Sequence, residues 1–379
     1  MIASPLPLAP APRVPAEQIQ VEFFESPLTP ELWAGYEAAT HSYGCTREFL
    51  EHFESPASAT LALVRSMPAG HVRAAFLYQL CQGGVVRVLG RFFASSAEHV
   101  GGFADALFAR HGGVNRIETD SIDALSEPRI IAWPVLALRE IKELRIPLPG
   151  SVEDYERMLH GSFLKRTRVR ERRLVRQYPS TRVVTLERDQ ISRALVADVV
   201  RLNRERRASK NGESVFDEYF EEGIYSVARA HGYATVVRDG DRLCAGVINI
   251  RSGTDAFFWV NGHDNGYNKF SPGTLCLLAS IRHCIARGVR TFHLLDGESD
   301  YKKEVGGMPA RLASYVVLRS WAALKPRDVT QLFLKHSEWV ARRTIDVADA
   351  VGERAFKQRA PVKSFAREVV HRLRRIGRA

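Results

Sequence analysis

The chain has 379 residues, of which 45% are hydrophobic and 26% are charged, and its formal net charge is +11. This composition is that of a globular protein with a sizeable core, so it excludes disorder as the overall state, and the length favours two domains or one duplicated domain. No run reaches the roughly 18 apolar residues that a membrane-spanning helix requires. The positive charge favours acidic partners: a phosphate-bearing cofactor, nucleic acid, an acidic carrier protein or an anionic membrane.

The start of the chain and the cysteines indicate the cellular compartment of the protein. Prolines at positions 5, 7, 10, 12 and 15 interrupt any helix there, so we expect a disordered leader over 1–18 and no signal peptide. The five cysteines are scattered, which indicates neither a disulfide framework nor a metal site. We therefore expect a cytoplasmic protein without a metal cofactor. Peripheral contact with the inner membrane is an alternative location.

One order of elements occurs twice along the chain. Apolar and alternating runs predict strands over 60–66, 72–80 and 84–92, a helix over 97–110 and a strand over 115–120. The order returns as strands over 233–238, 243–250 and 255–261, a helix over 272–287 and a strand over 290–296. Arg65 and Arg238 are 173 residues apart, and Gly113 and Gly288 are 175 apart. This constant spacing indicates an internal duplication.

The remaining segments connect and extend the two halves. A bridge of helical character covers about 151–230 and begins with Ser151 as an N-cap, with Asp154 in the first turn. The end of the chain contains basic amphipathic helices, which can pack on the core, bind a partner or lie on an anionic membrane. The expected divisions are a leader at 1–18, a first half at 19–150, a second half at 151–321 and a basic helical tail at 322–379.

The strongest local signal is the start of the helix predicted over 272–287. Ser271 at the N-cap and Pro272 at the first helical position form a favourable helix start. A helix start of this kind presents free amides and the positive end of the dipole, which suits a phosphate. Gly273 and Thr274 lie in its first turn, and Lys269 could add a charge. We therefore predict a binding site formed by Lys269, Ser271, Gly273 and Thr274.

Polar residues follow the strands on both sides of this helix. His263 and Asp264 follow the first strand, and Asp296 ends the second, shortly before Tyr301 and Lys302. In an α/β protein such strand ends meet beside a helix start and form a cleft. These five residues are the predicted catalytic group.

Together these residues resemble the acyltransferase domain of the GNAT superfamily. More narrowly, they resemble the family related to the cellulose-biosynthesis protein CelD and the FemAB peptidyltransferases. The matching features are Asp264 after a strand, the Ser271-Pro272-Gly273 helix start, Gly288, Asp296-Gly297 and Tyr301-Lys302. The basic stretch KRTRVRERRLVR, at 165–176, also looks like the Arg-rich helix of that family. The resemblance spans roughly 150–320, and more weakly 20–150 as a degenerate first half.

The resemblance implies an α/β fold of tandem GNAT-like halves, each a mixed twisted sheet flanked by helices. It also implies an N-acyltransferase that transfers an acyl group from an acyl thioester, usually acyl-CoA, to a small-molecule amine in a polysaccharide, lipid or secondary-metabolite pathway. Such a reaction needs a base, donors for the oxyanion and an acid for the leaving thiolate. Tyr301 matches the acid. Asp264 is the first candidate for the base, followed by His263 and Asp296.

One departure from the GNAT pattern keeps the donor open. The usual phosphate loop, Q/R-x-x-G-x-G/A, does not precede the helix, because NKFSPGT offers one Gly and a Pro that lacks an N–H. A carrier-protein phosphopantetheine or, as in FemAB proteins, an aminoacyl-tRNA is then an alternative to CoA. The basic stretch fits a solvated face, contact with CoA phosphates, or contact with tRNA or an acidic carrier. A third alternative is a non-catalytic accessory protein of a membrane polysaccharide synthase.

Overall fold

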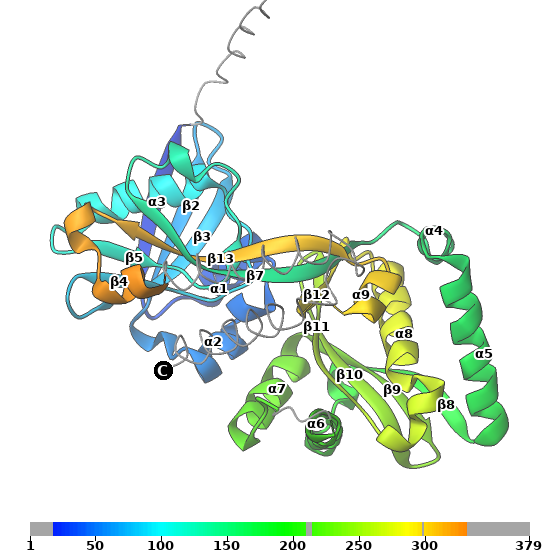
Figure 1. The fold of residues 1–379 in the computed structure, drawn as a ribbon. Helices are drawn as coiled ribbons and strands as arrows, with labels where there is room; N and C mark the ends of the chain where they lie inside the picture. The colour runs from blue at the N-terminus through cyan, green and yellow to red at the C-terminus, as the bar shows by residue number, and fades with distance from the viewer. Residues whose placement is uncertain (1–17, 210–213, 298, 332–379) are drawn as a thin grey trace, which may run out of the picture.

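The computed structural model describes residues 18–209, 214–297 and 299–331 (Figure 1). Nearly all of the predicted leader and most of the predicted basic tail lie outside the described residues. None of the described helices is long and apolar enough to cross a lipid bilayer. These described residues form one mixed sheet of 13 strands with helices on both faces, which confirms the predicted fold class.

Both halves repeat the predicted order of three strands, a helix and a strand, and in each half a strand and two helices that were not part of the predicted repeat precede it. The first half contains β1 (Ile19–Glu25), α1 (Pro30–Thr40), α2 (Arg47–Phe53), β2 (Thr60–Ser66), β3 (Val72–Cys81), β4 (Val85–Leu89), α3 (Ala97–Arg110), β5 (Arg116–Glu118), β6 (Ile122–Asp123) and β7 (Val135–Pro147). The second contains β8 (Thr181–Glu187), α6 (Arg193–Ala208), α7 (Glu218–His231), β9 (Gly232–Asp239), β10 (Arg242–Ser252), β11 (Asp255–His263), α8 (Pro272–Ala286), β12 (Thr291–Asp296), α9 (Asp300–Glu304) and β13 (Met308–Leu318).

The last strand of each half is inserted into the sheet of the other half. The strand order is β1-β2-β3-β4-β5-β13-β7-β12-β11-β10-β9-β8, and the short β6 pairs with β13 outside this path. β7 of the first half pairs with β12 of the second, while β13 of the second pairs with β5 of the first. β7 and β13 also pair with each other along most of their length and bridge the halves (Figure 1). Neither half can therefore complete its sheet alone.

Helices cover the sheet on both faces. In the second half, α6 and α7 lie on one face and α8 on the other (Figure 1). α2 of the first half packs on α7 of the second, where the rings of His52 and Tyr219 stack with centroids 4.4 Å apart. Gly223 sits at this contact, and a side chain there would come within 2.4 Å of the Phe53 ring. The halves thus touch through helices as well as through the shared sheet.

The segment predicted as a helical bridge, 151–230, contains four described α-helices, α4 to α7, and one strand, β8, which the sequence did not indicate. α4 (Val152–Met158) begins as predicted, because Ser151 Oγ accepts a hydrogen bond from the Asp154 amide at 3.0 Å. α5 (Gly161–Gln177) carries the Arg-rich stretch and lies alongside α8 (Figure 1). The expectation of helix throughout 151–230 is wrong at β8, an edge strand that pairs with β9 and whose middle residues are exposed.

The described start of the predicted tail packs on the first half. Asp328 is fully buried and pairs through both carboxylate oxygens with Arg116 of β5, at 2.5 and 2.7 Å. Both charges are thereby satisfied in the interior, which a buried ion pair requires. All five cysteines are free thiols, and Cys276 and Cys284 are buried in α8 as core residues.

Candidate active site

The parallel strands β11 and β12 separate partway along their length. They pair from Asp255 to Phe257 and from Thr291 to His293, and the pairing ends there. β11 then continues to His263 and β12 to Asp296. Leu295 in β12 has a left-handed backbone (φ 57°), and the register between β12 and β7 shifts beside it. Non-glycine residues in this conformation are strained and occur often at functional sites. The predicted catalytic residues follow these two strands.

Asp264 comes directly after β11 and caps the short 3-10 helix Asn265–Phe270. Its Oδ1 accepts a hydrogen bond from the Gly266 amide at 2.8 Å, and its Oδ2 accepts one from Arg242 Nη2 at 2.6 Å. Burial would raise the pKa of this carboxyl, but the two donors outweigh burial and lower the pKa below its usual value. Asp264 is therefore ionised, and both of its oxygens are engaged.

His263 packs against the start of α8. Its Nε2 lies 2.8 Å from Asn268 Oδ1. A side chain at Gly273 would come within 3.3 Å of His263 Nδ1, so glycine allows this close approach. The Thr274 amide donates to the Ser271 carbonyl at 2.9 Å. The structure thus brings His263, Asp264 and the start of α8 together, as the sequence predicted.

Ser271 differs from its predicted role. α8 begins with Pro272, as expected, but Ser271 has a left-handed backbone (φ 52°) and its side chain does not cap the helix. Its Oγ instead accepts a hydrogen bond from Arg170 Nη1 of α5 at 3.0 Å. The prediction of a side-chain N-cap is therefore wrong, because the hydroxyl turns towards α5 and away from the first-turn amides.

A hollow of about 400 Å³ lies between the end of α5 and the loop before α8. Arg173, Arg176, Gln177, Lys269 and Phe270 line it. Lys269, one of the predicted binding residues, is exposed here, while Phe270 is buried beneath. The contact of α5 with this loop was not foreseen from the sequence, although the density of arginines was a signal that it carries a role.

Lys302 and Asp296 form a second group at the end of β12. Lys302 is 6% exposed, and its Nζ donates to the carbonyls of Asp296 at 2.7 Å and Leu295 at 3.3 Å. Burial lowers the pKa of Lys302 to about 8. The ammonium thus holds the strained end of β12, while the Asp296 side chain is exposed beside it.

Tyr301 lies next to Lys302 on α9 and packs partly against the core of the second half. Burial raises the pKa of Tyr301 above its usual value, and the nearby Arg206 of α6 offsets part of this rise. Tyr301 therefore keeps its proton at neutral pH. A protonated phenol is able to donate a proton to a leaving group.

A buried polar network, which the sequence did not reveal, crosses the junction of the halves beside β12. Glu143 of β7 is fully buried; its Oε1 lies 2.9 Å from His293 Nδ1, and its Oε2 accepts from Arg145 Nε at 2.8 Å. Arg145 also pairs with Asp123 of β6. Burial would raise the pKa of Glu143, but His293 and Arg145 lower it. The one available signal was a glutamate within a strand that turns apolar at Leu144.

The described residues include one group that could hold a metal ion. Glu37, Glu48 and His231 place their ligand-type atoms within 4.8 Å of one another, on α1, α2 and α7. His231 Nε2 lies 2.6 Å from Glu48 Oε2, so these two residues already form a contact between the halves. None of the three was singled out in the sequence.

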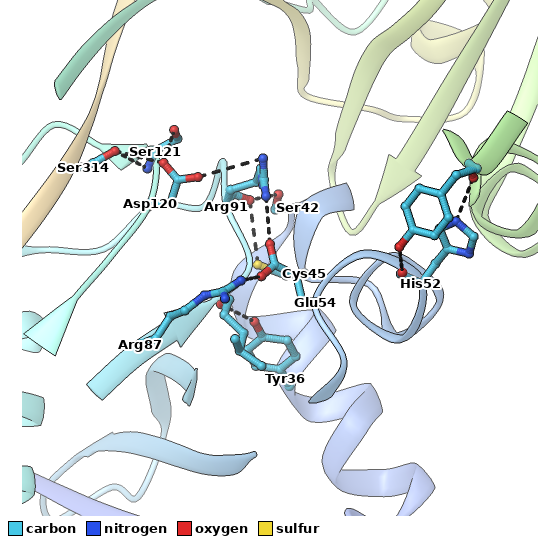
Figure 2. Close-up of polar contacts among 12 residues, drawn as sticks. Tyr36, Ser42, Cys45, His52, Glu54, Arg87, Arg91, Asp120, Ser121 and Ser314 are labelled. Carbon is cyan, nitrogen blue, oxygen red and sulfur yellow. Dashed lines mark hydrogen bonds and ion pairs between the residues drawn. The ribbon is translucent and has the colours of Figure 1, made fainter. Parts of the chain in front are cut away.

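The first half has a matching strand separation, but charged residues of the chain occupy it. β4 and β5 pair over Val85–Arg87 and Arg116–Glu118 before they separate. Figure 2 shows Arg91 beyond this point, donating to Glu54 Oε1 at 2.8 Å and lying 3.9 Å from Asp120. Asp120 in turn accepts hydrogen bonds from Ser121 and Ser314 at 2.8 and 2.9 Å. The polar groups at these strand ends are thus paired with one another.

Comparisons with known proteins agree with this geometry. Residues 161–303 match the family model of the acetyltransferase (GNAT) domain. The crystal structure of FemX superposes with a TM-score of 0.54 at 10% identity, covering 76% of this chain and 96% of FemX. A conserved protein of unknown function from Bacteroides thetaiotaomicron VPI-5482 superposes with a TM-score of 0.52 at 9% identity, covering 79% of this chain and 100% of that one. The search of curated proteins found no match.

The fold is therefore a tandem arrangement of two GNAT-like α/β halves. The match to the GNAT acetyltransferase domain lies in the second half and includes α5, the separated strands β11 and β12, and α9 up to Lys303. At 10% identity or less, the likeness to the two solved structures concerns the fold alone. The narrower likeness to the CelD family remains a prediction from the sequence.

Proposed function

We propose that this protein is an N-acyltransferase that transfers an acyl group from an acyl-CoA to a small-molecule amine. The observation that carries the proposal is the separation of β11 and β12 before the start of α8, together with the protonated Tyr301 on α9, the helix that follows β12. Parallel strands that separate leave backbone groups free to bind the extended amide-bearing arm of a thioester donor. The match of residues 161–303 to the GNAT domain supports the same class of reaction.

In our proposal, the first half does not bind the donor and does not carry out the reaction. Its corresponding strand ends hold the Arg91–Glu54 pair and the hydrogen bonds of Asp120 (Figure 2). A donor arm entering there would have to displace charged groups that already satisfy one another, which is costly. At β11 and β12 the corresponding positions are Asn261 and Leu295, which carry no charge. The second half is therefore the better site.

In the proposed reaction, the neutral amine of the acceptor attacks the thioester carbonyl. The carbon–nitrogen bond forms as the carbon–sulfur bond breaks, the amine loses a proton to a base, and the thiolate takes a proton from Tyr301. We assign the base to Asp296, because its side chain is exposed at the strand end. Asp264 is less suitable because Gly266 and Arg242 occupy both of its oxygens. His263, the other candidate, lies beside Asp264 at the end of β11, and its Nε2 contacts Asn268 Oδ1.

A second candidate donor is an aminoacyl-tRNA, as the resemblance to FemAB proteins implies. The observation that favours it is the number of exposed cations on α5, such as Lys165 and Arg172, which exceeds what a small donor can contact. Nucleic-acid binding through such cations weakens steeply as salt rises. Binding at low and physiological salt therefore separates the two donors.

A thermal-shift panel tests the proposal with CoA, acetyl-CoA, longer acyl-CoAs and a charged tRNA. A ligand that binds the native state alone raises Tm by mass action, so an acyl-CoA at about 100 times its Kd should raise Tm by on the order of a few degrees. We expect this rise with at least one acyl-CoA, growing with its concentration. A rise with the tRNA and none with any CoA species would favour the second candidate.

A further inference from the structure

The start of α8 offers few amide donors to the phosphates of a donor. Pro272, its first residue, has no N–H, and the Thr274 amide already donates to the Ser271 carbonyl at 2.9 Å. A phosphate group needs several hydrogen-bond donors or positive charges to replace its water. Most of that charge must therefore come from side chains near the helix start.

α5 brings arginines to this place. Arg170 reaches Ser271 Oγ at 3.0 Å, and Arg173 and Arg176 follow along the helix and line the hollow of about 400 Å³ with Lys269. Successive arginines are three residues apart, so the set spans about 9 Å along the axis of α5, from the start of α8 toward the hollow. Among the described residues, no acidic side chain lines this hollow.

The position of α5 is fixed by contacts on both sides. Its own residues Phe163, Thr167 and Leu174 are buried on its inner face. Arg166 of α5 pairs with Glu304 of α9, the helix that also carries Tyr301. Phe270, at 3% exposure, forms the apolar base of the hollow. Its ring contacts the Tyr178 ring edge to face, with centroids 5.9 Å apart. The hollow is thus built from a fixed helix and a packed aromatic ring.

We propose that this hollow binds the 3′-phosphoadenosine end of coenzyme A through Arg173, Arg176 and Lys269. The inference rests on the proposed function, because it places the far end of the same donor. The volume lies in the range of small-molecule sites, about 300–1,000 Å³. A guanidinium binds a phosphate through two parallel hydrogen bonds, which makes arginine well suited to this group. α5 thus supplies by side chains the charge that the first turn of α8 lacks.

The proposal predicts that CoA occupies the hollow and that the phosphopantetheine of a carrier protein does not. A carrier-bound phosphopantetheine has one phosphate, which would lie beside the start of α8 near Arg170, and it has no nucleotide to enter the hollow.

The proposal also predicts that CoA and a nucleic acid would contact different cations of α5. Lys165 is exposed on the same helix but does not line the hollow, because it lies eight residues, about 12 Å along the helix axis, before Arg173. A nucleic acid lying along α5 would use Lys165, whereas CoA would not.

Isothermal titration with CoA, dephospho-CoA and 4′-phosphopantetheine tests the proposal. We expect wild type to bind CoA roughly 10-fold to 100-fold more tightly than dephospho-CoA, the range of one or two charge-assisted contacts. The double variant Arg173→Glu/Arg176→Glu should lose this preference. Lys165→Glu, a charge reversal on the same helix but outside the hollow, should retain it. All four changed or lining cations are exposed, and circular dichroism with thermal melting checks that each variant is folded.

Several results would overturn the proposed CoA site in the hollow. They can be distinguished from the result that would contradict the proposed acyl transfer. Equal binding of CoA and dephospho-CoA by wild type, or a preference that survives in the double variant, removes the hollow while leaving acyl transfer intact. Tight binding of phosphopantetheine alone points to a carrier. Binding of a tRNA acceptor-stem fragment that Lys165→Glu weakens as much as the double variant points to nucleic acid. Absence of binding by every thioester-related ligand contradicts both the hollow and the function.

Discussion

Single residues at the end of β12 were located by the sequence, but their environments were not. Tyr301 and Lys302 stood out because polar residues followed an apolar strand. The structure adds that Lys302 is buried and binds two backbone carbonyls at the strained Leu295. Neither burial nor a left-handed backbone at a leucine has a sequence signal, because both depend on what packs around the residue.

Lys302 gives a prediction about pH. Burial lowers its pKa to about 8, below the 10.5 of an ordinary lysine. Between these values the unfolded chain binds more protons at this residue than the native state does, so the contribution of Lys302 to stability rises with pH. We expect the free energy of unfolding of wild type, minus that of Lys302→Met, to increase by on the order of 1–3 kcal/mol from pH 7.5 to pH 10.5.

Urea denaturation of both proteins across this pH range measures the difference. Because other titrating groups are common to the two proteins, their effects cancel in the subtraction. A difference that does not change with pH would show that Lys302 has an ordinary pKa in the native state.

The same limit applies to Asp264 and Ser271. Both lie where the sequence placed them, beside the start of α8, but their partners are Arg242 and Arg170, which are distant in the chain. Capping by Ser271 was inferred from local preference alone. The contact with Arg170 requires α5 to lie against α8, and only tertiary packing determines that.

At the scale of elements, the sequence identified what has clear periodicity. The helix over 97–110 was predicted closely because it has one buried, patterned face, and the strands β2, β9 and β10 because they are mostly apolar runs buried on both faces. β7 and β13 were not identified. The middle of β7, at Arg139, Glu140 and Lys142, is exposed in the ribbon that joins the halves, so its charges obscure the strand pattern.

β8 was missed for a related reason. It lies at the edge of the sheet, and Val183 and Val184 are both about 40% exposed, so its residues do not alternate between buried and exposed positions. The helical segments on either side then made the whole bridge look helical. Short edge strands of this kind carry weak patterns because one face and one edge remain in solvent.

At the scale of the whole molecule, the exchange of β7 and β13 makes the halves interdependent. The duplication could be inferred from spacing, but the exchange could not, because pairing between distant strands leaves no local pattern. Glu143, His293, Arg145 and Asp123 strengthen the junction with a buried polar network that draws on both halves. Separation of the halves would expose this network and leave unpaired strand edges.

We therefore predict that a fragment beginning at residue 150 is insoluble or does not unfold cooperatively. It lacks β7, which pairs with both β12 and β13, so two strands lose their shared partner. A fragment beginning at residue 132 retains β7 and should be the more soluble of the two. Expression followed by thermal melting compares them. A cooperative melt of the shorter fragment, equal to that of the longer one, would contradict the importance of the exchanged strand.

The central claim is that acyl transfer takes place where β11 and β12 separate, with Tyr301 as the acid for the leaving thiolate. The most direct test is the turnover of Tyr301→Phe with the acyl-CoA that stabilises the wild type, measured as the release of free thiol. We predict a fall of roughly 100-fold to 10,000-fold, the usual contribution of a general acid, with donor binding unchanged in the thermal-shift assay. Undiminished turnover would remove Tyr301 from the mechanism and contradict this account of the site.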